Sequence, residues 1–304
     1  MRLFFLRSLL FGLLFVTQGC VTNARQTDEL LRAVPQGLAR SSEIPDVPFN
    51  DQSVGHCGPA TLAMAMNWNG VKISADDLAR QVYTPGMKGS FQADMISASR
   101  RNSMMAVKIE GLTALLSEIH AGHPVIVFEN LAMTWLPQYH YALVYGYDLD
   151  QEVAIMHSGP ERGKRWDLRK FERSWMLGNY WGLVVLPPGK LSASGSELAH
   201  LQAAAGLEQI SKTEEARKSY SAILERWPES LGALIGLGNI TYAKKDFSTS
   251  VKHLRQAVLL HANSATAWHN LSLAEAAAGF KKQSKVSAAR AAELSADQKK
   301  APAP

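Results

Sequence analysis

Apolar and polar residues follow one another differently in the two halves of the chain. Between residues 46 and 187, segments with helical periodicity come first and continuous apolar runs come later. The predicted helices are Leu62–Trp68, a short segment begun by the capping pattern Ser74–Asp77, Met95–Arg101 and Leu112–His120. The predicted strands are Val125–Phe128, Tyr141–Tyr145, Val153–Met156 and Gly182–Leu186. Helices followed by strands predict an α+β domain over residues 46–187.

After residue 196 the strand pattern disappears, and Ala and Leu recur with helical spacing. Residues 188–196 are rich in Pro, Gly and Ser and predict a linker. Matching residues stand 34 positions apart, namely Leu234 with Trp268, Leu237 with Leu271, Ser250 with Ser284 and Ala257 with Ala291. This pattern resembles tetratricopeptide repeats, which implies an all-α region over residues 197–297.

Stacked repeats of this kind form a concave groove, so the resemblance implies binding of a peptide or a protein partner. A generic helical bundle is the alternative architecture, and a structural spacer is the alternative role. Residues 298–304 are expected to be a disordered tail, because they are polar and end in Ala and Pro.

The first 19 residues have the pattern of a signal peptide. Arg2 and Arg7 flank the start of the leader, and the apolar stretch Ser8–Val16 follows. This stretch is shorter than the ~20 residues that a membrane-spanning helix needs. The pattern therefore favours a secretory leader over a transmembrane anchor.

The leader ends in Thr-Gln-Gly before Cys20, which resembles a bacterial lipobox. The resemblance implies that Cys20 becomes an acylated N-terminus and a lipid anchor. Residues 21–24 contain no Asp, which by the same resemblance implies the outer membrane of the cell envelope, facing the periplasm. Residues 20–45 are polar and predict a tether. An ordinary secretory leader cleaved nearby is the alternative.

Composition narrows the possible functions. The chain has 304 residues, of which 46% are apolar and 19% are charged, enough for a buried core and for about two domains. The net charge is +5, but no basic stripe is interleaved with aromatic residues, so nucleic-acid binding is not expected. The histidines and cysteines lack the spacing of a zinc site, and neither a metal nor another cofactor is expected.

The two cysteines of the chain are Cys20 and Cys57. Acylation of Cys20 would leave Cys57 as a lone thiol outside the cytoplasm, where structural cysteines normally form disulfides. Cys57 precedes Gly-Pro, a sequence that favours the first turn of a helix, and a helix N-terminus stabilises a thiolate. Gln52, five residues upstream, is placed to donate a hydrogen bond in an oxyanion hole. This pattern indicates a catalytic nucleophile.

His140 is the favoured general base among nine histidines. It stands at the start of the predicted strand Tyr141–Tyr145, from which a side chain can project from a rigid sheet. His56 is adjacent to Cys57 and is expected to point in another direction. Trp135, shortly before His140, is a candidate wall of a substrate cleft.

Three motifs occur in the order of one known family. They are Gln-x4-Cys-Gly-Pro-Ala at 52–60, Gly-His-Pro-Val-Ile-Val at 122–127, and His-Tyr-Ala-Leu-Val-Tyr-Gly-Tyr-Asp at 140–148. The chain thus resembles the bacteriocin-processing, double-glycine-type cysteine peptidases over residues 46–187. The resemblance implies a papain-like fold, with Cys57 as nucleophile, His140 as base and acid, and Gln52 as oxyanion donor.

One position departs from this family. An Asp that orients the histidine is usual on the next strand, whereas Ser158 stands at about that place here. A serine can accept a hydrogen bond from the imidazole but supplies no negative charge. The site is therefore a Cys-His dyad, or takes its third member from elsewhere in the chain, or is weakly active.

The leading hypothesis is a thiol peptidase of the cell envelope that cleaves a periplasmic peptide or protein through an acyl-enzyme. The repeats would bind the substrate or a partner. The same fold acting as an amidase or transpeptidase on cell-wall peptides is one alternative. A catalytically weak adaptor that works through its repeats is the other.

Overall fold

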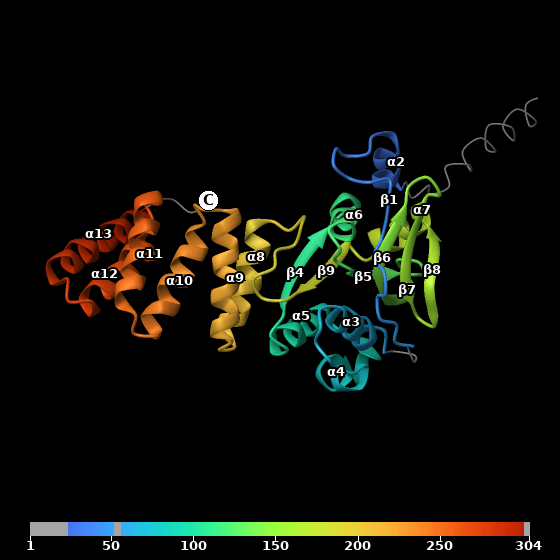
Figure 1. The fold of residues 1–304 in the computed structure, drawn as a ribbon, viewed down its shortest axis with the longest axis horizontal. Coiled ribbons are helices and arrows are strands. Elements are labelled where there is room, and N and C mark those ends of the chain that lie inside the picture. The colour runs from blue at the N-terminus through green and yellow to red at the C-terminus, as the bar shows by residue number, and fades with distance from the viewer. Residues whose placement is uncertain (1–23, 52–55, 301–304) are drawn as a thin grey trace, which may run out of the picture.

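The computed structural model describes residues 24–51 and 56–300. A seven-stranded antiparallel sheet with helices on its faces is followed by a helical region (Figure 1). The sheet has the order β4-β9-β5-β6-β7-β8, and β1 pairs with the far end of β6. The chain is therefore an α+β domain with a helical C-terminal region, as the sequence pattern predicts.

The strands and the helices around them have these bounds. The strands are β1 (Ser41–Glu43), β4 (Met105–Glu110), β5 (Val125–Asn130), β6 (Tyr139–Asp148), β7 (Val153–Ser158), β8 (Glu161–Asp167) and β9 (Trp181–Leu186), with a separate hairpin of β2 (Tyr83–Thr84) and β3 (Gly89–Ser90). The helices are α2 (Arg25–Arg32), α3 (Cys57–Trp68), α4 (Ala75–Val82), η1 (Pro85–Met87), α5 (Gln92–Arg101), α6 (Leu112–His120) and α7 (Leu168–Met176).

The core of this domain lies between the sheet and helices on both faces. Figure 1 shows α3, α4 and α5 below the sheet and α6 above it. Nearly all of α3 is buried, including Leu62, Met64 and Met66, so it is a central helix and not an amphipathic surface helix. The strands β5 and β9 read as continuous apolar runs because helices cover both faces of the sheet.

The predicted helices and strands are present, and each is as long as predicted or longer. The domain also contains β4, β8 and α7, which the sequence pattern does not predict. Strand β8 is polar and mostly exposed, since it forms the edge of the sheet. The short helix α7 is amphipathic and begins at a cap in which the Asp167 carboxylate accepts a hydrogen bond from the Lys170 N–H.

The predicted tether differs from the structure over residues 24–45. Helix α2 lies there, and the Glu172 carboxylate accepts hydrogen bonds from the backbone N–H groups of Gln26 and Thr27, at 2.9 and 2.7 Å. Strand β1 then pairs with β6 from Ser41 to Glu43. These contacts join residues more than 100 positions apart, so local polarity could not reveal them.

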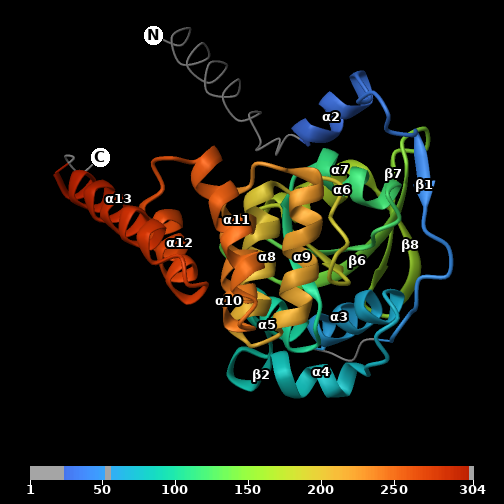
Figure 2. The ribbon, with the colours of Figure 1, turned by 60° about the vertical axis from the view of Figure 1, so that its left-hand side comes forward.

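The helical region consists, within the described residues, of α8 (Glu197–Gln209), α9 (Thr213–Arg226), α10 (Leu231–Ala243), α11 (Phe247–Leu260), α12 (Ala265–Ala277) and α13 (Lys281–Lys300). Successive helices pack side by side, and α8 packs against β4 of the sheet (Figure 2). Helix α13 includes residues 298–300, where the sequence predicts a disordered tail. The helix continues there because its Ala, Lys and Glu residues favour helix.

The 34-residue period sets the helix starts. Ser196, Ser230 and Ser264 are the N-caps of α8, α10 and α12, and each hydroxyl accepts a backbone N–H. Within one pair, a Cβ added to Gly238 would lie 2.6 Å from Leu254, so only glycine allows this close approach. The Ser250 hydroxyl donates to the Gly238 carbonyl at 2.8 Å, which adds a hydrogen bond between the two helices of the pair.

A buried carboxylate joins the helical region to the sheet domain. Glu118 of α6 is 0% exposed and accepts hydrogen bonds from Ser192, Ala193 and Ser194 of the linker and from His123. Burial opposes its ionisation, but these hydrogen bonds outweigh burial and lower its pKa to about 2. The linker is therefore bound to the domain as an ordered segment.

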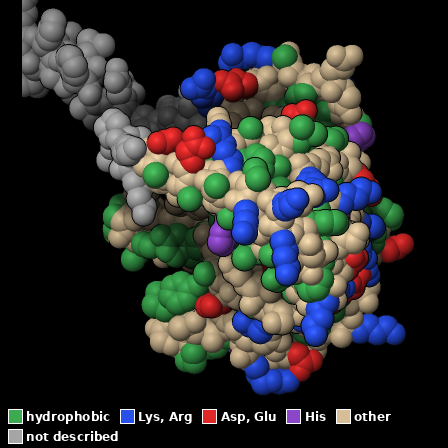
Figure 3. All heavy atoms as spheres, turned by 90° about the vertical axis from the view of Figure 1, so that its left-hand side faces the viewer, with side chains coloured by type: hydrophobic (Ala, Val, Ile, Leu, Met, Phe, Trp, Pro, Cys, Tyr) green, Lys and Arg blue, Asp and Glu red, His purple; other side chains and the backbone are tan. Residues whose placement is uncertain are grey.

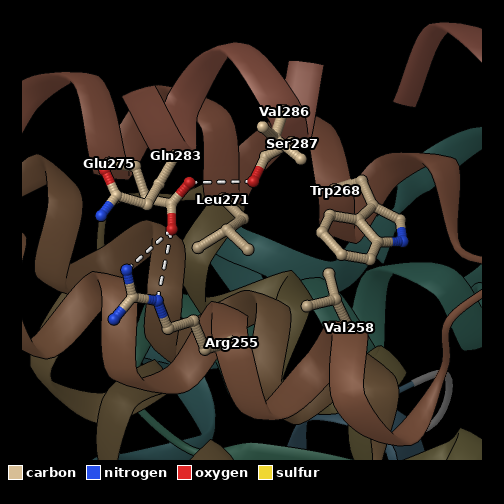
Figure 4. Close-up of a pocket in the computed structure, with 8 residues that line it drawn as sticks. All are labelled: Arg255, Val258, Trp268, Leu271, Glu275, Gln283, Val286 and Ser287. Carbon is tan, nitrogen blue, oxygen red and sulfur yellow. Dashed lines mark hydrogen bonds and ion pairs between the residues drawn. The ribbon is translucent and has the colours of Figure 1, made fainter. Parts of the chain in front are cut away.

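A small cavity of about 350 Å³ lies among α11, α12 and α13 (Figure 4). Glu275 is nearly buried and accepts from the Arg255 guanidinium at 2.9 Å and from the Ser287 hydroxyl at 2.8 Å. Trp268 and Leu271 supply apolar walls. Figure 3, which looks onto the helical end, shows Lys and Arg side chains spread over this face and not gathered in one stripe.

None of the helices among the described residues is both long and apolar enough to cross a membrane.

Candidate active site

Cys57 is the first residue of α3, as the Gly-Pro sequence predicts. The backbone N–H groups of Cys57 and Gly58, at the helix start, and that of Tyr141 favour the thiolate form of the sulfur. A Cβ added to Gly58 would lie 2.7 Å from the Ser90 hydroxyl oxygen, so glycine is needed for α3 to approach β3. The helix start and the first residues of β6 thus meet at the sulfur.

His140 lies near the start of β6, one residue before Tyr141. Its Nε2 is 3.0 Å from the Ser158 hydroxyl oxygen, at the end of β7. This contact leaves Nδ1 as the ring nitrogen that can take a proton from the thiol. Ser158 therefore stands where a third member of a triad would orient the imidazole.

Cys57, His140 and Ser158 line one cleft of about 1260 Å³. Two segments that line it, here called the rim loops, are the β2–β3 hairpin and the β5–β6 connection. The β7–β8 turn lines it too. Apolar side chains that line it are Met87, Phe91, Phe128, Leu131 and Tyr139. The rings of Phe128 and Tyr139 are stacked, with centroids 5.0 Å apart. Trp135 lies in the same connection but is exposed and does not line the cleft.

The electrostatics of the pair differ from the sequence prediction. Burial raises the pKa of the Cys57 thiol, and the backbone hydrogen bonds at the helix start oppose burial without cancelling it. Burial, with a smaller contribution from the Lys164 ammonium, lowers the pKa of His140 to about 4. Both shifts favour the neutral forms of the thiol and the imidazole in the free site, whereas the helix start alone predicts a thiolate.

Other predicted residues can be placed as follows. Gln52 and Cys20 lie outside the described residues, so their roles stay predictions. The His56 ring packs edge-on against Tyr83, with centroids 4.9 Å apart, and His56 is not among the residues that line the cleft. Over residues 24–51 and 56–300, no group of three His, Cys, Asp or Glu side chains could hold a metal ion.

Two ionisable residues near His140, Glu129 and Lys164, are not predicted from the sequence. Glu129 lies directly opposite His140 in the β5–β6 ladder and is 0% exposed. Lys164 of β8 lines the cleft and lowers the pKa of both groups. A carboxylate at the end of an apolar run was the available signal for Glu129, whereas β8 gave no strand pattern.

The comparisons with known proteins concern the N-terminal domain. Residues 44–180 match the model of the Peptidase_C39 like family. No curated protein matches the chain. The matched range contains the cleft and ends before the helical region, so the family resemblance predicted from the motifs is confirmed for the N-terminal domain.

Three solved structures are each similar to about half of the chain. A protein of Bacillus anthracis assigned as a C39-like peptidase is 18% identical, with a TM-score of 0.43, over 50% of this chain and 98% of its own. The peptidase domain of Streptococcus ComA is 20% identical, with a TM-score of 0.38, over 46% of this chain and 96% of its own. A double glycine motif protease from an AMS/PCAT transporter is 17% identical, with a TM-score of 0.37, over 48% and 94%.

Proposed function

We propose that the N-terminal domain, related by its family match to C39-like peptidases, is a cysteine peptidase with Cys57 as nucleophile and His140 as general base and acid. The observation that carries this proposal is the meeting of a helix N-terminus bearing the thiol with a strand bearing the histidine in one cleft. A nucleophile and base within one cleft, with the base bonded to a third group, is the arrangement of covalent hydrolases.

The reaction starts from a neutral pair. As a peptide carbonyl approaches, Nδ1 of His140 takes the Cys57 proton while the sulfur attacks the carbonyl carbon. The negative charge moves to the carbonyl oxygen, where a backbone N–H at the start of α3 and the Gln52 amide are the proposed donors. His140 then gives its proton to the leaving amine, and the C–N bond breaks to leave a thioester.

Hydrolysis of the thioester completes the cycle. His140, neutral again, takes a proton from a water molecule, which attacks the thioester carbonyl. Collapse of this second intermediate releases the carboxylic acid, and the proton held by His140 returns to the sulfur. Ser158 holds the imidazole through Nε2 in every step, because this nitrogen does not exchange a proton with the substrate.

The rim of the cleft supports an apolar peptide as substrate. Large hydrophobic side chains of the two rim loops are exposed, although such residues are normally buried. Those that also line the cleft are Met87, Phe91, Leu131 and Tyr139. We infer that the cleft takes an extended peptide with apolar side chains on the two sides of the cleaved bond.

We also propose where in the cell the enzyme is located. The leader and Cys20 support a lipid anchor in the outer membrane with the domain in the periplasm, and the helical region supports binding of the substrate or of a protein partner. Globomycin treatment of cells that produce the full chain should accumulate the uncleaved form, and Cys20→Ser should remove lipid labelling. Release of the unmodified protein as a soluble periplasmic species would instead support an ordinary secretory leader.

A peptidyl acyloxymethyl ketone tests the peptidase proposal. The protein starting after Cys20 should gain the mass of the probe at Cys57, and Cys57→Ala should abolish the adduct. His140→Ala should slow the reaction by at least about a hundredfold, the usual contribution of a general base. Equal labelling rates in wild type and His140→Ala would refute the role of His140 as the general base for Cys57. Absence of labelling with a set of apolar probes would favour the adaptor role.

A further inference from the structure

Glu129 is a buried acid beside the proposed catalytic histidine. It lies on β5 directly opposite His140 on β6, and directly opposite residues of an antiparallel pair place their side chains on the same face, with Cβ atoms roughly 5 Å apart. The Glu129 side chain is 0% exposed. Helix α7 covers it, and the Ser174 hydroxyl donates to its Oε1 at 2.6 Å.

Its second oxygen has no partner in the described part of the chain. Oε2 is buried and makes no hydrogen bond there. The other buried glutamates behave differently: Glu118 and Glu172 each accept several hydrogen bonds, and Glu275 is paired with Arg255. An incompletely bonded carboxyl in a core costs free energy, and such groups cluster at functional sites.

We propose that Glu129 is a positioning residue for His140, which supplies from β5 the negative charge that Ser158 on β7 cannot supply. The inference rests on the proposed function of His140. The acid expected on the strand after the histidine is thereby replaced by an acid on the strand before it, on the same face of the sheet. Its charge stabilises the imidazolium that forms while the thiol attacks the substrate.

The groups around Glu129 support this role. His140 faces it from β6, Ser174 bonds it from α7, and Lys164 of β8 acts on it through space. On its other side β5 pairs with apolar residues and a glycine of β9, from Val125 to Val127. Burial raises the pKa of Glu129 to about 7, while Ser174 and Lys164 act in the opposite direction.

The ionisation of Glu129 sets the direction in which the acylation rate changes with pH. As pH rises through about 7, the carboxyl releases its proton to solvent and becomes the counter-charge of the imidazolium. Protonation of His140 during attack is then easier, so acylation should speed up through this range. Under this proposal the two groups titrate as a coupled pair, so removal of one changes the titration of the other.

Glu129→Gln tests the proposal, because it keeps the shape and an acceptor for Ser174 but cannot ionise. Glu172→Gln is the matched control, since it neutralises another buried glutamate that only accepts structural hydrogen bonds. The readouts are the rate of acyloxymethyl ketone labelling of Cys57 between pH 5.5 and 9, and the pH dependence of the His140 ¹³Cε1–¹H resonance, assigned with His140→Ala.

We expect Glu129→Gln to lower the labelling rate by about ten- to a hundredfold above pH 7, the range for loss of a unit charge about 5–6 Å away at an effective dielectric constant of about 20–40. It should also remove an inflection near pH 7 from the His140 resonance, while Glu172→Gln keeps both profiles. A wild-type profile in Glu129→Gln would overturn the proposal, as would equal losses in the two variants. If Glu129→Gln does not fold, absence of the inflection in wild type itself overturns it.

Failure of the proposed function gives a different result. In that case the wild-type protein is not labelled at any pH, whereas the coupling between Glu129 and His140 is still measured by the resonance.

Discussion

The hydrogen bonds to Glu118 allow one stability prediction to be worked out in full. This carboxylate is 0% exposed and joins α6 to the linker through Ser192, Ala193 and Ser194. Glu118→Gln replaces one acceptor oxygen by an NH₂ group, which would face donors. The variant should therefore lose both the charge and part of the hydrogen-bond set, and the linker should separate from α6 more easily.

The magnitude follows from the pKa of Glu118. Lowering this pKa from its ordinary 4.5 to about 2 corresponds to about 3 kcal/mol of folding free energy. Because the folded-state pKa lies below the unfolded one, this stabilisation is fully present above about pH 4.5. It is lost as pH falls toward 2. Wild type should thus be about 3 kcal/mol more stable than Glu118→Gln at pH 7, and the difference should shrink below pH 4.5.

Urea unfolding followed by far-ultraviolet circular dichroism at pH 7, 4 and 3 measures this difference. Glu110→Gln is the control, since Glu110 is an exposed glutamate whose ion pair with Lys108 is worth less than about 1 kcal/mol. A loss below about 1 kcal/mol in Glu118→Gln at pH 7 would refute the reasoning. So would a difference that stays constant from pH 7 to pH 3, because then charge would not be its origin.

Three further predictions concern the cleft and the repeats. Iodoacetamide should alkylate Cys57 with an apparent pKa above that of a free cysteine, because burial raises the pKa of the thiol; a lowered value would show an ion pair at rest. Ser158→Asp should raise the pKa of His140 above about 4 and increase the rate of peptidyl-probe labelling severalfold at pH 7. Ser158→Ala should decrease that rate. An unchanged labelling rate in both variants would exclude a contact between Ser158 and His140. Gly238→Val should lower stability by about 2 kcal/mol or more in thermal unfolding, since Leu254 occupies the space; an unchanged midpoint would contradict the packing of α10 and α11.

The sequence predicted the parts of the site that depend on local chemistry. Gly58 and Pro59 after Cys57 favour a helix start, and α3 begins at Cys57. The apolar run after His140 predicts a strand, and β6 contains it. Repeated N-cap serines were present at the 34-residue period, although the prediction of the repeats used only the packing positions.

The remaining parts depend on contacts that local patterns do not encode. The pairing of Glu129 with His140 is fixed by the register of β5 and β6, and so by the shape of the loop between them. The docking of α2 depends on Glu172, about 145 residues away. The pKa of Cys57 was predicted from the helix start alone, whereas the burial that outweighs it arises only when α3 meets the sheet.

The early start of the folded domain restricts where an anchored protein could work. Helix α2 begins at Arg25, and its first turn is bound to α7 through Glu172. With the proposed acylation of Cys20, only residues 21–24 separate the lipid from this helix, a span of at most about 15 Å when extended. The peptidase domain would then stay next to the lipid headgroups, and it would meet most readily those peptides that emerge at, or travel along, the membrane surface.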